Sequence, residues 1–329
     1  MTNPLVDQIN LQQTTSHSYT SSWHHDWTIG PNLHGGHVAA VVQLAAQTHF
    51  TTTLAGQNQP DILTLHLDFL VGCVHQTMQI TVVDVKIGKV TSTIQLQVKQ
   101  KDKLKAIATA TSTNFSRPLG PTAKSDWALH PPTKPVPDFE KVLARQPEDN
   151  WIPSILAGEI GPFTSQLIVL QPRGGFPVAG VLDSWYTYPG ERIDSTYLTM
   201  MNDVMPSMSD TLLHNNGPFN GHVLFAASEA WAKENPGIPA PLTNSFREAA
   251  KATSIDMTLA LDVQYKRRLP KEGLEWVFSR IAARMLDGGR MDLNVTLCDQ
   301  NMDVLCLANH TVLVVGDQRK YNGGKKGKL

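Results

Sequence analysis

The stretch from Thr258 to Val315 constrains the fold more than any other part of the chain, because it predicts a set of antiparallel strands together with their turns. Apolar and polar residues alternate from Leu259 to Tyr265, which is the period of a strand with one buried face. The turn sequences LPKEG, DGGR and DQNMD then lead into three more apolar segments, at 276–283, 293–297 and 304–315. The stretch therefore predicts a four-stranded meander.

A second stretch, residues 62–115, carries a weaker copy of this pattern. Phe69 stands where Tyr265 stands in the later stretch, and the letters IGKV stand where GGRM stands. The chain thus contains one module twice. Because two copies of a module usually pack against each other, we expect the functional site at the seam between them.

The composition is that of an ordinary globular protein. The 329 residues are enough for two domains or one large pseudo-symmetric unit, and 41% of them are hydrophobic. Lys and Arg number 28 against 29 Asp and Glu, a formal charge of -1, so no charge excess points to nucleic acid. We expect a small hydrophobic substrate as the partner, and a monomer or a homodimer.

The cysteines and the chain ends indicate the compartment. Cys73, Cys298 and Cys306 are an odd number without metal-type spacing, which favours reduced thiols in an intracellular protein. The start has no apolar signal core, and the longest apolar run, at 38–46, is too short to cross a bilayer. We expect a cytoplasmic protein without membrane insertion. The final Gly-Lys-Leu imperfectly resembles a peroxisomal address, which gives the peroxisome as an alternative.

The first half of the chain has a recognisable order of elements. Residues 18–30 are typical of a first strand, and PNLHGG then opens a helix at His37 that continues as VAAVVQLAAQTHF. Its alanines suit close packing against a curved sheet. A strand, a buried helix and a four-stranded sheet wrapped round the helix make up the hotdog arrangement.

Prolines mark the boundary between the halves. We assign residues 18–118 to an N-terminal module, 119–158 to a Pro-rich linker, 159–318 to a C-terminal module and 319–329 to a basic tail. Within the C-terminal module the composition predicts strands at 159–170 and 180–189.

The second central helix has two candidate positions. The preferred one is Asp194 to Met205, stopped by Pro206, because its connection to the preceding strand is short. The alternative is His222 to Glu234, where glycine and histidine again precede a helical pattern. Residues 207–253 have no counterpart in the first half and form an added segment that we expect to be largely helical.

Three motifs together resemble a known family: LHGGHVAA, then LPKEGLEW, then DGGRMDLNVTLCDQNMDVLCLANH. They are similar to the thioesterase-like double-hotdog proteins, especially fungal members of the acyl-CoA thioesterase superfamily. The resemblance implies an α+β fold in which two antiparallel-sheet modules, each wrapped round a central helix, form one pseudo-symmetric unit. It also implies hydrolysis of a CoA- or carrier-bound acyl thioester in a tunnel between the modules, without a cofactor.

The catalytic residues of the family do not carry over directly. In the bacterial-type branch an Asp on the first meander strand, a Ser or Thr on the second and a Gln on the last position the attacking water. Ala260 stands at the first of these positions, Arg284 stands near the second, and His310 stands at the third. None of the three agrees with the family pattern, although Asp262 lies two residues after Ala260 on the same face of the strand.

Candidate oxyanion and substrate contacts lie at the start of the first helix. Gly35 and Gly36 would let a substrate carbonyl approach free backbone N–H groups at the positive end of the helix. His34 and His37 could act as acid or base there. The alternative is that the glycines only let the helix pass close to the sheet.

Candidate catalytic residues lie on the strands. Asp262 is the predicted general base, its pKa raised by burial, with an outward-facing strand residue as the alternative. His310 with Asn309 could donate to a substrate oxygen, or His310 could be a satisfied core histidine. His66 takes in the first module the place that Asp262 takes in the second, so pseudo-symmetry could bring the two together. Arg284 is a further candidate substrate contact.

No metal or cofactor is predicted. Adjacent histidines, as in the HHD sequence at 24–26, point to opposite faces of a strand and do not easily bind one ion. The chain contains no HExxH, P-loop or GxSxG motif, and no GxGxxG after a strand.

Three hypotheses for function follow. The first is a thioesterase that uses water attack. The second is a repurposed non-hydrolytic enzyme of fungal secondary metabolism: a cyclase of the Diels-Alder type, a dehydratase or an isomerase, which needs little more than a held substrate and one polarised carbonyl. The third is a non-catalytic lipid-binding protein. We prefer the first.

Overall fold

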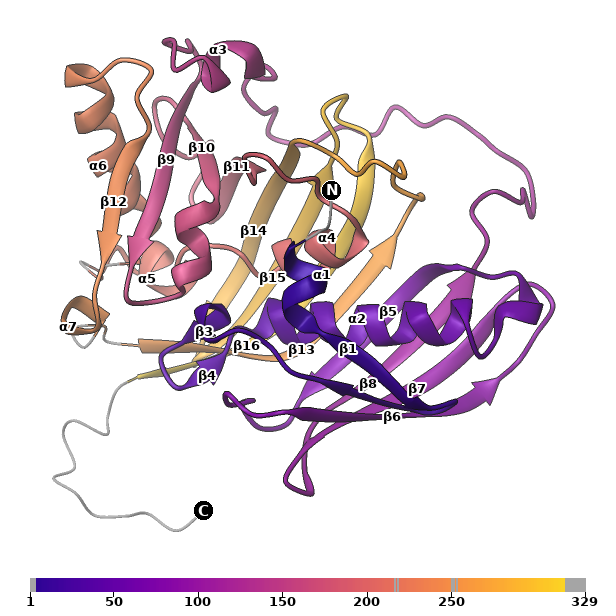
Figure 1. Cartoon of the computed structure of the whole chain (residues 1–329). Helices are drawn as coiled ribbons and strands as arrows, with labels where there is room; N and C mark the ends of the chain where they lie inside the picture. The colour runs from indigo at the N-terminus through magenta and orange to yellow at the C-terminus, as the bar shows by residue number, and fades with distance from the viewer. Residues whose placement is uncertain (1–3, 216, 218, 250–251, 253, 317–329) are drawn as a thin grey trace, which may run out of the picture.

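The structure is a computed structural model that describes residues 4–215, 217, 219–249, 252 and 254–316. The predicted tail at 319–329, including its final Gly-Lys-Leu, lies outside these residues. One large sheet with a few short helices confirms the α+β class (Figure 1). Within the described residues, no helix is both long and apolar enough to cross a membrane.

Within the described residues the sheet has 14 strands. Adjacent strands are antiparallel except for the last pair in the order below, which is parallel. From one edge to the other the strands are β1 (Leu11–Thr15), β2 (Ser18–Ser21), β6 (Met78–Lys86), β7 (Ser92–Gln100), β8 (Lys103–Thr113), β5 (Asp61–Phe69), β13 (Ser254–Tyr265), β16 (Val304–Gly316), β15 (Arg290–Cys298), β14 (Val277–Asp287), β11 (Val181–Thr187), β10 (Ile168–Pro172), β9 (Trp151–Gly158) and β12 (Ala240–Asn244). A small hairpin of β3 (Thr28–Ile29) and β4 (Asn32–Leu33) stands apart from it.

Both predicted four-strand stretches are strands, but their pairing differs from a simple meander. In each stretch the first strand pairs with the fourth and not with the second. The connections at 70–77 and 266–276 are too long for tight hairpins, and the second contains the LPKEG turn. As a result the two first strands, β5 and β13, pair with each other and join the halves into one sheet.

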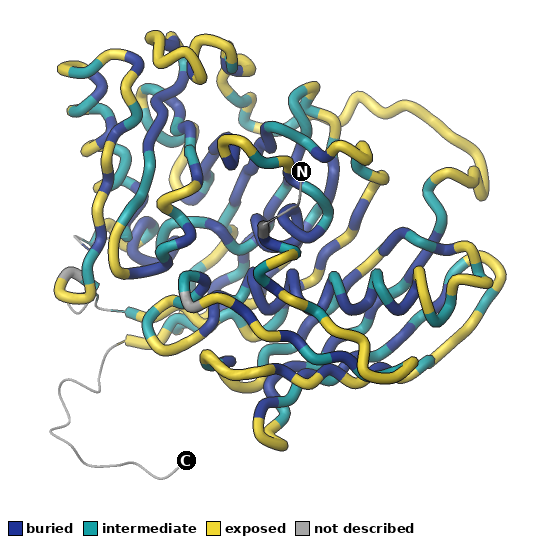
Figure 2. The backbone as a smooth tube through the Cα atoms, viewed as in Figure 1, coloured by how far each residue is buried: buried dark blue, intermediate teal, exposed yellow. Residues whose placement is uncertain are grey.

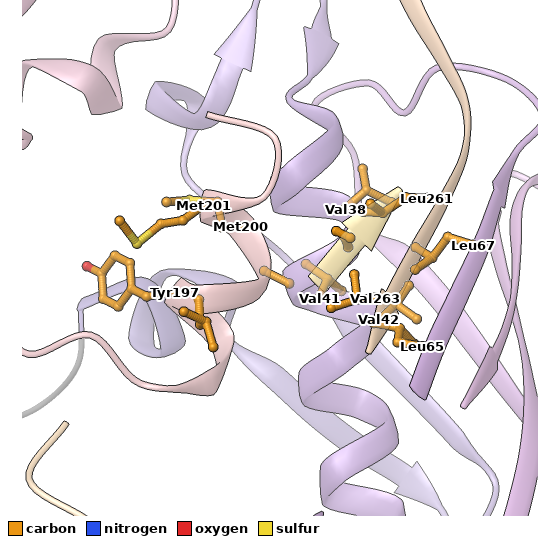
Figure 3. Close-up of a cluster of buried hydrophobic side chains, with 14 of the residues drawn as sticks. Val38, Val41, Val42, Leu65, Leu67, Tyr197, Met200, Met201, Leu261 and Val263 are labelled. Atoms are coloured by element: carbon orange, nitrogen blue, oxygen red, sulfur yellow. The ribbon is translucent and has the colours of Figure 1, made fainter. Parts of the chain in front are cut away.

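The helix α2 (Gly35–Thr51) crosses the first half of the sheet and is buried along most of its length (Figure 2). Its four alanines at 39, 40, 45 and 46 have no exposed surface, which confirms the expected close packing. The shorter α4 (Ser195–Met201) packs against α2. Around these two helices, apolar side chains of β5 and β13 form the core at the seam (Figure 3).

At the preferred position of the second central helix the structure has α4, which ends four residues before the predicted end. Asp194 caps α4 by accepting from the N–H groups of Thr196 and Tyr197. At the other end the Asn202 side chain turns back to the carbonyl of Leu198, 3.0 Å away. The alternative position corresponds to α6 (Gly221–Glu234), which lies against β9 and β12 at the far edge of the sheet.

The remaining helical elements are short. They are α1 (Pro4–Ile9), α3 (Phe139–Leu143), α5 (Met208–Leu212), α7 (Phe246–Ala249) and the 3₁₀ turns η1 (His25–Trp27), η2 (Ala55–Gln57) and η3 (Pro162–Gln166).

Several predicted boundaries are wrong. The strand predicted at 18–30 is confined to β2, and η1 and the small hairpin follow it. Residues 151–158, assigned to the linker, form β9, which begins with the buried pair Trp151 and Ile152 and includes Pro153. Of the strand predicted at 159–170, residues 162–166 form η3 and only the last three residues belong to β10. The segment at 207–253 is not only helical, since β12 within it extends the sheet.

The linker covers the outer face of β11 and β14 in the second half. A separate apolar cluster of Trp151, Trp185, Trp276 and Phe278 lies there with α3. In the same layer Arg280 donates to both oxygens of Asp183, each at 2.7 Å, and to the carbonyl of Pro131 at 2.6 Å. Both partners of this ion pair are buried.

Replacing Arg280 by alanine is expected to lower the free energy of unfolding by about 3–5 kcal/mol, because Asp183 would remain as an unpaired buried charge. Chemical denaturation followed by tryptophan fluorescence measures the effect. Arg284→Ala, on the same strand but 71% exposed, is the matched control and should change it by less than about 0.5 kcal/mol. Equal losses in the two variants would contradict the assignment of Arg280 as a buried clamp.

Candidate functional site

The start of α2 meets the end of α4 at the seam between the halves. His34 is the N-cap residue of α2, and its ring Nε2 lies 3.0 Å from the carbonyl oxygen of Asp203, just beyond α4. The same nitrogen lies 3.5 Å from Oδ2 of Asp203. Both neighbours are oxygens that only accept, so Nε2 of His34 carries a proton.

The Asp203 carboxylate faces the N-terminus of α2. Its Oδ2 accepts a hydrogen bond of 2.7 Å from the N–H of Gly36. The positive end of the helix favours the ionised carboxylate at this place. The side chain is 18% exposed, so a bound molecule can reach it.

The two glycines are required by this close approach. A Cβ on Gly35 would lie 2.8 Å from Oδ2 of Asp203, and one on Gly36 would lie 2.9 Å from its Cβ and still closer to the carbonyl oxygen of Met200. The Gly36 N–H is already used by Asp203. The Gly35 N–H, at the first helical position, has no acceptor within the helix and is the donor left for a ligand.

His310 reaches the same place from β16. Its Nε2 lies 3.1 Å from the carbonyl oxygen of Asn202 and therefore donates to it, which leaves the lone pair on Nδ1. That Nδ1 lies 3.9 Å from Oδ1 of Asp203. Burial lowers the pKa of His310 even though Asp203 and the Asn202 carbonyl raise it, and nearby His34 lowers it further. His310 is therefore neutral at neutral pH.

Among the described residues, four buried ring nitrogens here have no hydrogen-bond partner: Nδ1 of His34, Nδ1 of His310 and both ring nitrogens of the neighbouring His37. An unsatisfied buried polar atom is costly in a folded protein, and such atoms gather where a ligand or water completes their hydrogen bonds. The three side chains of His34, Asp203 and His310 are hereafter called the seam cluster.

His37 lies next to the seam cluster but serves as a wall. Its ring is fully buried and stacked on Trp27, with ring centroids 4.9 Å apart. Burial, assisted by the neighbouring His34, lowers the pKa of His37 to about 3. It thus stays neutral, and the acid or base role that the sequence suggested for it has no support in this environment.

Buried hydrogen bonds hold Asp203 from both sides. The hydroxyl of Tyr186 donates to the carbonyl of Val204 at 3.1 Å. On the other side, Thr199 of α4 is joined to the hydroxyl of Tyr265 on β13 at 2.6 Å. These contacts tie the segment that carries Asp203 to the sheet, which positions the carboxylate.

An apolar cavity of about 110 Å³ lies in the second half of the chain, lined by the residues that follow Asp203 in sequence but by none of the seam-cluster side chains. Val204, Met205 and Pro206, which follow Asp203 directly, form one wall, and side chains of β9, β10, β11 and α6 form the others. Its polar lining includes Gln171, whose buried Oε1 has no partner among the described residues. The cavity can receive an apolar chain that carries a hydrogen-bond donor.

Asp262 and His66 do meet, as the duplication suggested, but on the other face of the sheet. They pair across β5 and β13 with Nδ1 of His66 2.6 Å from Oδ1 of Asp262. Their side chains are 42% and 53% exposed respectively. The burial expected to raise the pKa of Asp262 is therefore absent, because its neighbours Leu261 and Val263 take the buried face.

The remaining predicted contacts also lie outside the seam cluster. Asn309 is exposed and accepts from the side-chain amide of Asn294. Arg284 is exposed, 4.0 Å from Asp292. Of the predicted site residues, His34, Gly35, Gly36, His37 and His310 are brought together, and the roles predicted for these and for the others stay predictions.

Asp203 was missed by the sequence analysis. Asp203 lies in the sequence MMNDVMP, at the end of the predicted second central helix. An Asp next to an Asn is typical of a helix end, so the sequence gives no sign of a functional role. Only the packing of α4 against α2 brings it to the glycines, which lie more than 160 positions earlier. No local spacing could have found it.

Comparison with known families identifies the chain. The N-terminal domain of the acyl-CoA thioesterases matches residues 23–114, and the C-terminal domain of the same family matches residues 137–314. These matches cover most of the chain, including the whole seam cluster. The chain therefore belongs to the acyl-CoA thioesterase family.

Individual relatives agree with this assignment. The thioesterase-like protein TwmA of Talaromyces wortmannii is 26% identical over 96% of this chain and 92% of its own. A protein of Alicyclobacillus acidocaldarius, described as having a hot dog fold, superposes with a TM-score of 0.67 over 96% of this chain and 99% of its own, at 15% identity. The acyl-CoA thioesterase II TesB2 of Mycobacterium marinum gives 0.60 over 98% and 100%, at 14% identity. The fold is thus of the hotdog type.

Replacing Gly36 by alanine is expected to destabilise the protein by about 1–3 kcal/mol, because the added methyl group forces α2 away from Met200 and Asp203. Gly56→Ala is the control, since a Cβ there meets nothing within 4 Å. The midpoint of urea unfolding measures both. A Gly36→Ala protein as stable as the control would show that the two helices are not in close contact at this point.

Proposed function

We propose that the protein hydrolyses an acyl thioester by water attack at the seam cluster. One observation carries the proposal: Oδ1 of Asp203 and Nδ1 of His310 lie 3.9 Å apart, and both are acceptors. A gap of this size between two polar atoms suits a single bridging water. A water that donates to both atoms has its lone pair free to attack a carbonyl carbon.

The balance of the reaction assigns a role to each group. Asp203 takes a proton as the water oxygen bonds to the thioester carbon, with His310 holding the second hydrogen. The N–H of Gly35, at the positive end of α2, stabilises the oxyanion that forms. Loss of the thiolate breaks the C–S bond and yields the free acid, and the proton on Asp203 is passed to the leaving sulfur or to solvent.

The apolar cavity lined by Val204, Met205 and Pro206, the residues that follow Asp203, supports a hydrophobic acyl group as the substrate. Its walls are mostly apolar, and it begins at the residues next to Asp203. Membership of the acyl-CoA thioesterase family supports coenzyme A as the thiol, and a carrier protein is the alternative. The exposed edge of Asp203 allows the thioester to sit at the cluster while the thiol part stays outside.

We also propose that the fold is a pseudo-symmetric double hotdog. The similar order of strands in the two halves, joined through β5 and β13, supports this. The position of β9 extends the second unit to residues 151–316, with the linker reduced to 119–150 and the segment at 207–253 as an addition. Cavity walls from α6 and β12 give that addition a place beside the substrate.

A non-hydrolytic reaction is the second candidate, and the lining of the cavity favours it. Gln171 has a buried oxygen that needs a donor, which fits a hydroxylated polyketide-type chain better than a plain fatty acyl chain. The same acid and base groups could then serve a cyclase, a dehydratase or an isomerase. Mass spectrometry separates the cases: hydrolysis releases the acid and the thiol, dehydration removes one water, and cyclisation or isomerisation leaves the mass unchanged.

Asp203→Asn is expected to lower kcat/KM for acyl-CoA hydrolysis by about 100-fold or more, since a general base contributes on this scale. His310→Ala should lose activity similarly, whereas His310→Gln should retain part of it because an amide can still hold the water. Release of free thiol from acyl-CoA substrates of several chain lengths measures all three.

Asp262→Asn distinguishes the two candidate carboxylates. If Asp203 is the base, the Asp262 variant keeps its activity, because that side chain faces the other side of the sheet. Loss of activity in Asp262→Asn together with full activity in Asp203→Asn would contradict the mechanism proposed for the seam cluster. A wild-type protein that releases no thiol from any chain length would turn attention to the second candidate.

A further inference from the structure

A second cluster of histidine and carboxylate side chains lies at the other end of α2. His17 stands between β1 and β2, His49 on the last turn of α2, and Asp84 on β6. Nε2 of His17 lies 3.2 Å from Oδ2 of Asp84, and Nε2 of His49 lies 3.0 Å from Oδ1. Their ligand atoms all lie within 4.8 Å of one another.

The three side chains combine a fixed interior with an open side. His49 is fully buried, whereas His17 and Asp84 are 43% and 27% exposed. An ion could therefore enter from solvent, bind three protein ligands, and keep a water as its fourth. This is the coordination number that zinc adopts in proteins, with nitrogen and oxygen ligands about 2.0–2.2 Å from the ion.

The outer ring nitrogens of both histidines are held by hydroxyl groups. Nδ1 of His49 lies 3.2 Å from the hydroxyl of Tyr19, and Nδ1 of His17 lies 2.9 Å from Oγ of Ser16. A hydroxyl oxygen can accept a hydrogen bond from the Nδ1–H group, which leaves the lone pair of Nε2 directed at Asp84. Histidine ligands of metals usually have such a partner behind them, because it fixes the ring and its tautomer.

We propose that His17, His49 and Asp84 form a binding site for a divalent zinc ion. Two imidazoles and one carboxylate are a donor set that suits zinc, and no spacing in the sequence could have shown it, since the three residues are more than 30 positions apart. The HHD sequence at 24–26 supplies none of the ligands. The alternative explanation of these contacts is that both imidazole rings donate an Nε2–H hydrogen bond to Asp84 and no ion binds. A test of the proposal has to distinguish zinc binding from these hydrogen bonds.

The position of the site indicates a structural role. Fifteen residues of α2 separate His49 from His34, which is about 22 Å along the helix. None of the three ligands lines the cavity beside Asp203. A zinc ion there would tie the end of α2 to β6 and to the turn before β2, and it would leave the seam cluster untouched.

Titration of the full chain with Zn²⁺ after treatment with a chelator tests the proposal. We expect one Zn²⁺ bound per chain at micromolar concentration or below, with a higher melting temperature. His17→Ala and Asp84→Asn should each weaken binding by more than tenfold, and Tyr19→Phe, which removes the hydroxyl behind His49, by about tenfold. His24→Ala is the matched control, because it removes a half-exposed histidine beside a carboxylate, and among the described residues only His17, His49 and Asp84 bring three such ligand atoms within 4.8 Å of one another.

Binding of Co²⁺ in place of Zn²⁺ gives a second readout, since a four-coordinate site produces strong visible absorption. Circular dichroism of each metal-free variant checks that it is folded. If Asp84→Asn fails to fold, Zn²⁺ binding by His17→Ala, which changes a half-exposed side chain, tests the proposal. No stoichiometric binding of Zn²⁺, or binding that His17→Ala and Asp84→Asn leave unchanged, overturns the proposal.

Discussion

The hydrogen bond from the N–H of Gly36 to the carboxylate of Asp203 is the contact on which the candidate site depends. It joins the first turn of a helix in one half of the chain to the end of a helix in the other. The two glycines make the approach possible, and the helix dipole stabilises the charge that approaches. Since the two glycines and His34 come from the first half and Asp203 and His310 from the second, neither half of the chain holds the complete candidate site.

Residues with alternating or amphipathic patterns were predictable from the sequence. The alternation around Leu261 and Val263 correctly placed β13, and the glycines before His37 correctly placed the start of the first helix. The same alternation also implied that Asp262 faces away from the core. The family pattern had suggested the opposite, and a shift of one residue in register is enough to reverse the face.

Features that arise from contacts between distant segments could not be predicted. Asp203 gains its position from the packing of α4 on α2, and β12 gains its partner from a segment more than 80 positions earlier. Trp151 lies at the end of a proline-rich stretch, and only the three-dimensional cluster with Trp185 and Trp276 shows why a strand begins there. In each case the decisive neighbour lies far away in the sequence, where local propensity carries no information.

The path of the linker makes the two outer faces of the sheet unequal. Over β11 and β14 the linker and α3 form a further layer, with Phe139 stacked on Trp276 and the carbonyl of Pro135 accepting from Trp151. Over β6 and β7 the outward side chains are exposed or half-buried, and Val83 and Val85 are among the exposed ones. Among the described residues, a molecule approaching the sheet from outside would therefore meet the linker over β11 and β14, whereas over β6, β7 and the central strand β13 it would touch strand side chains directly.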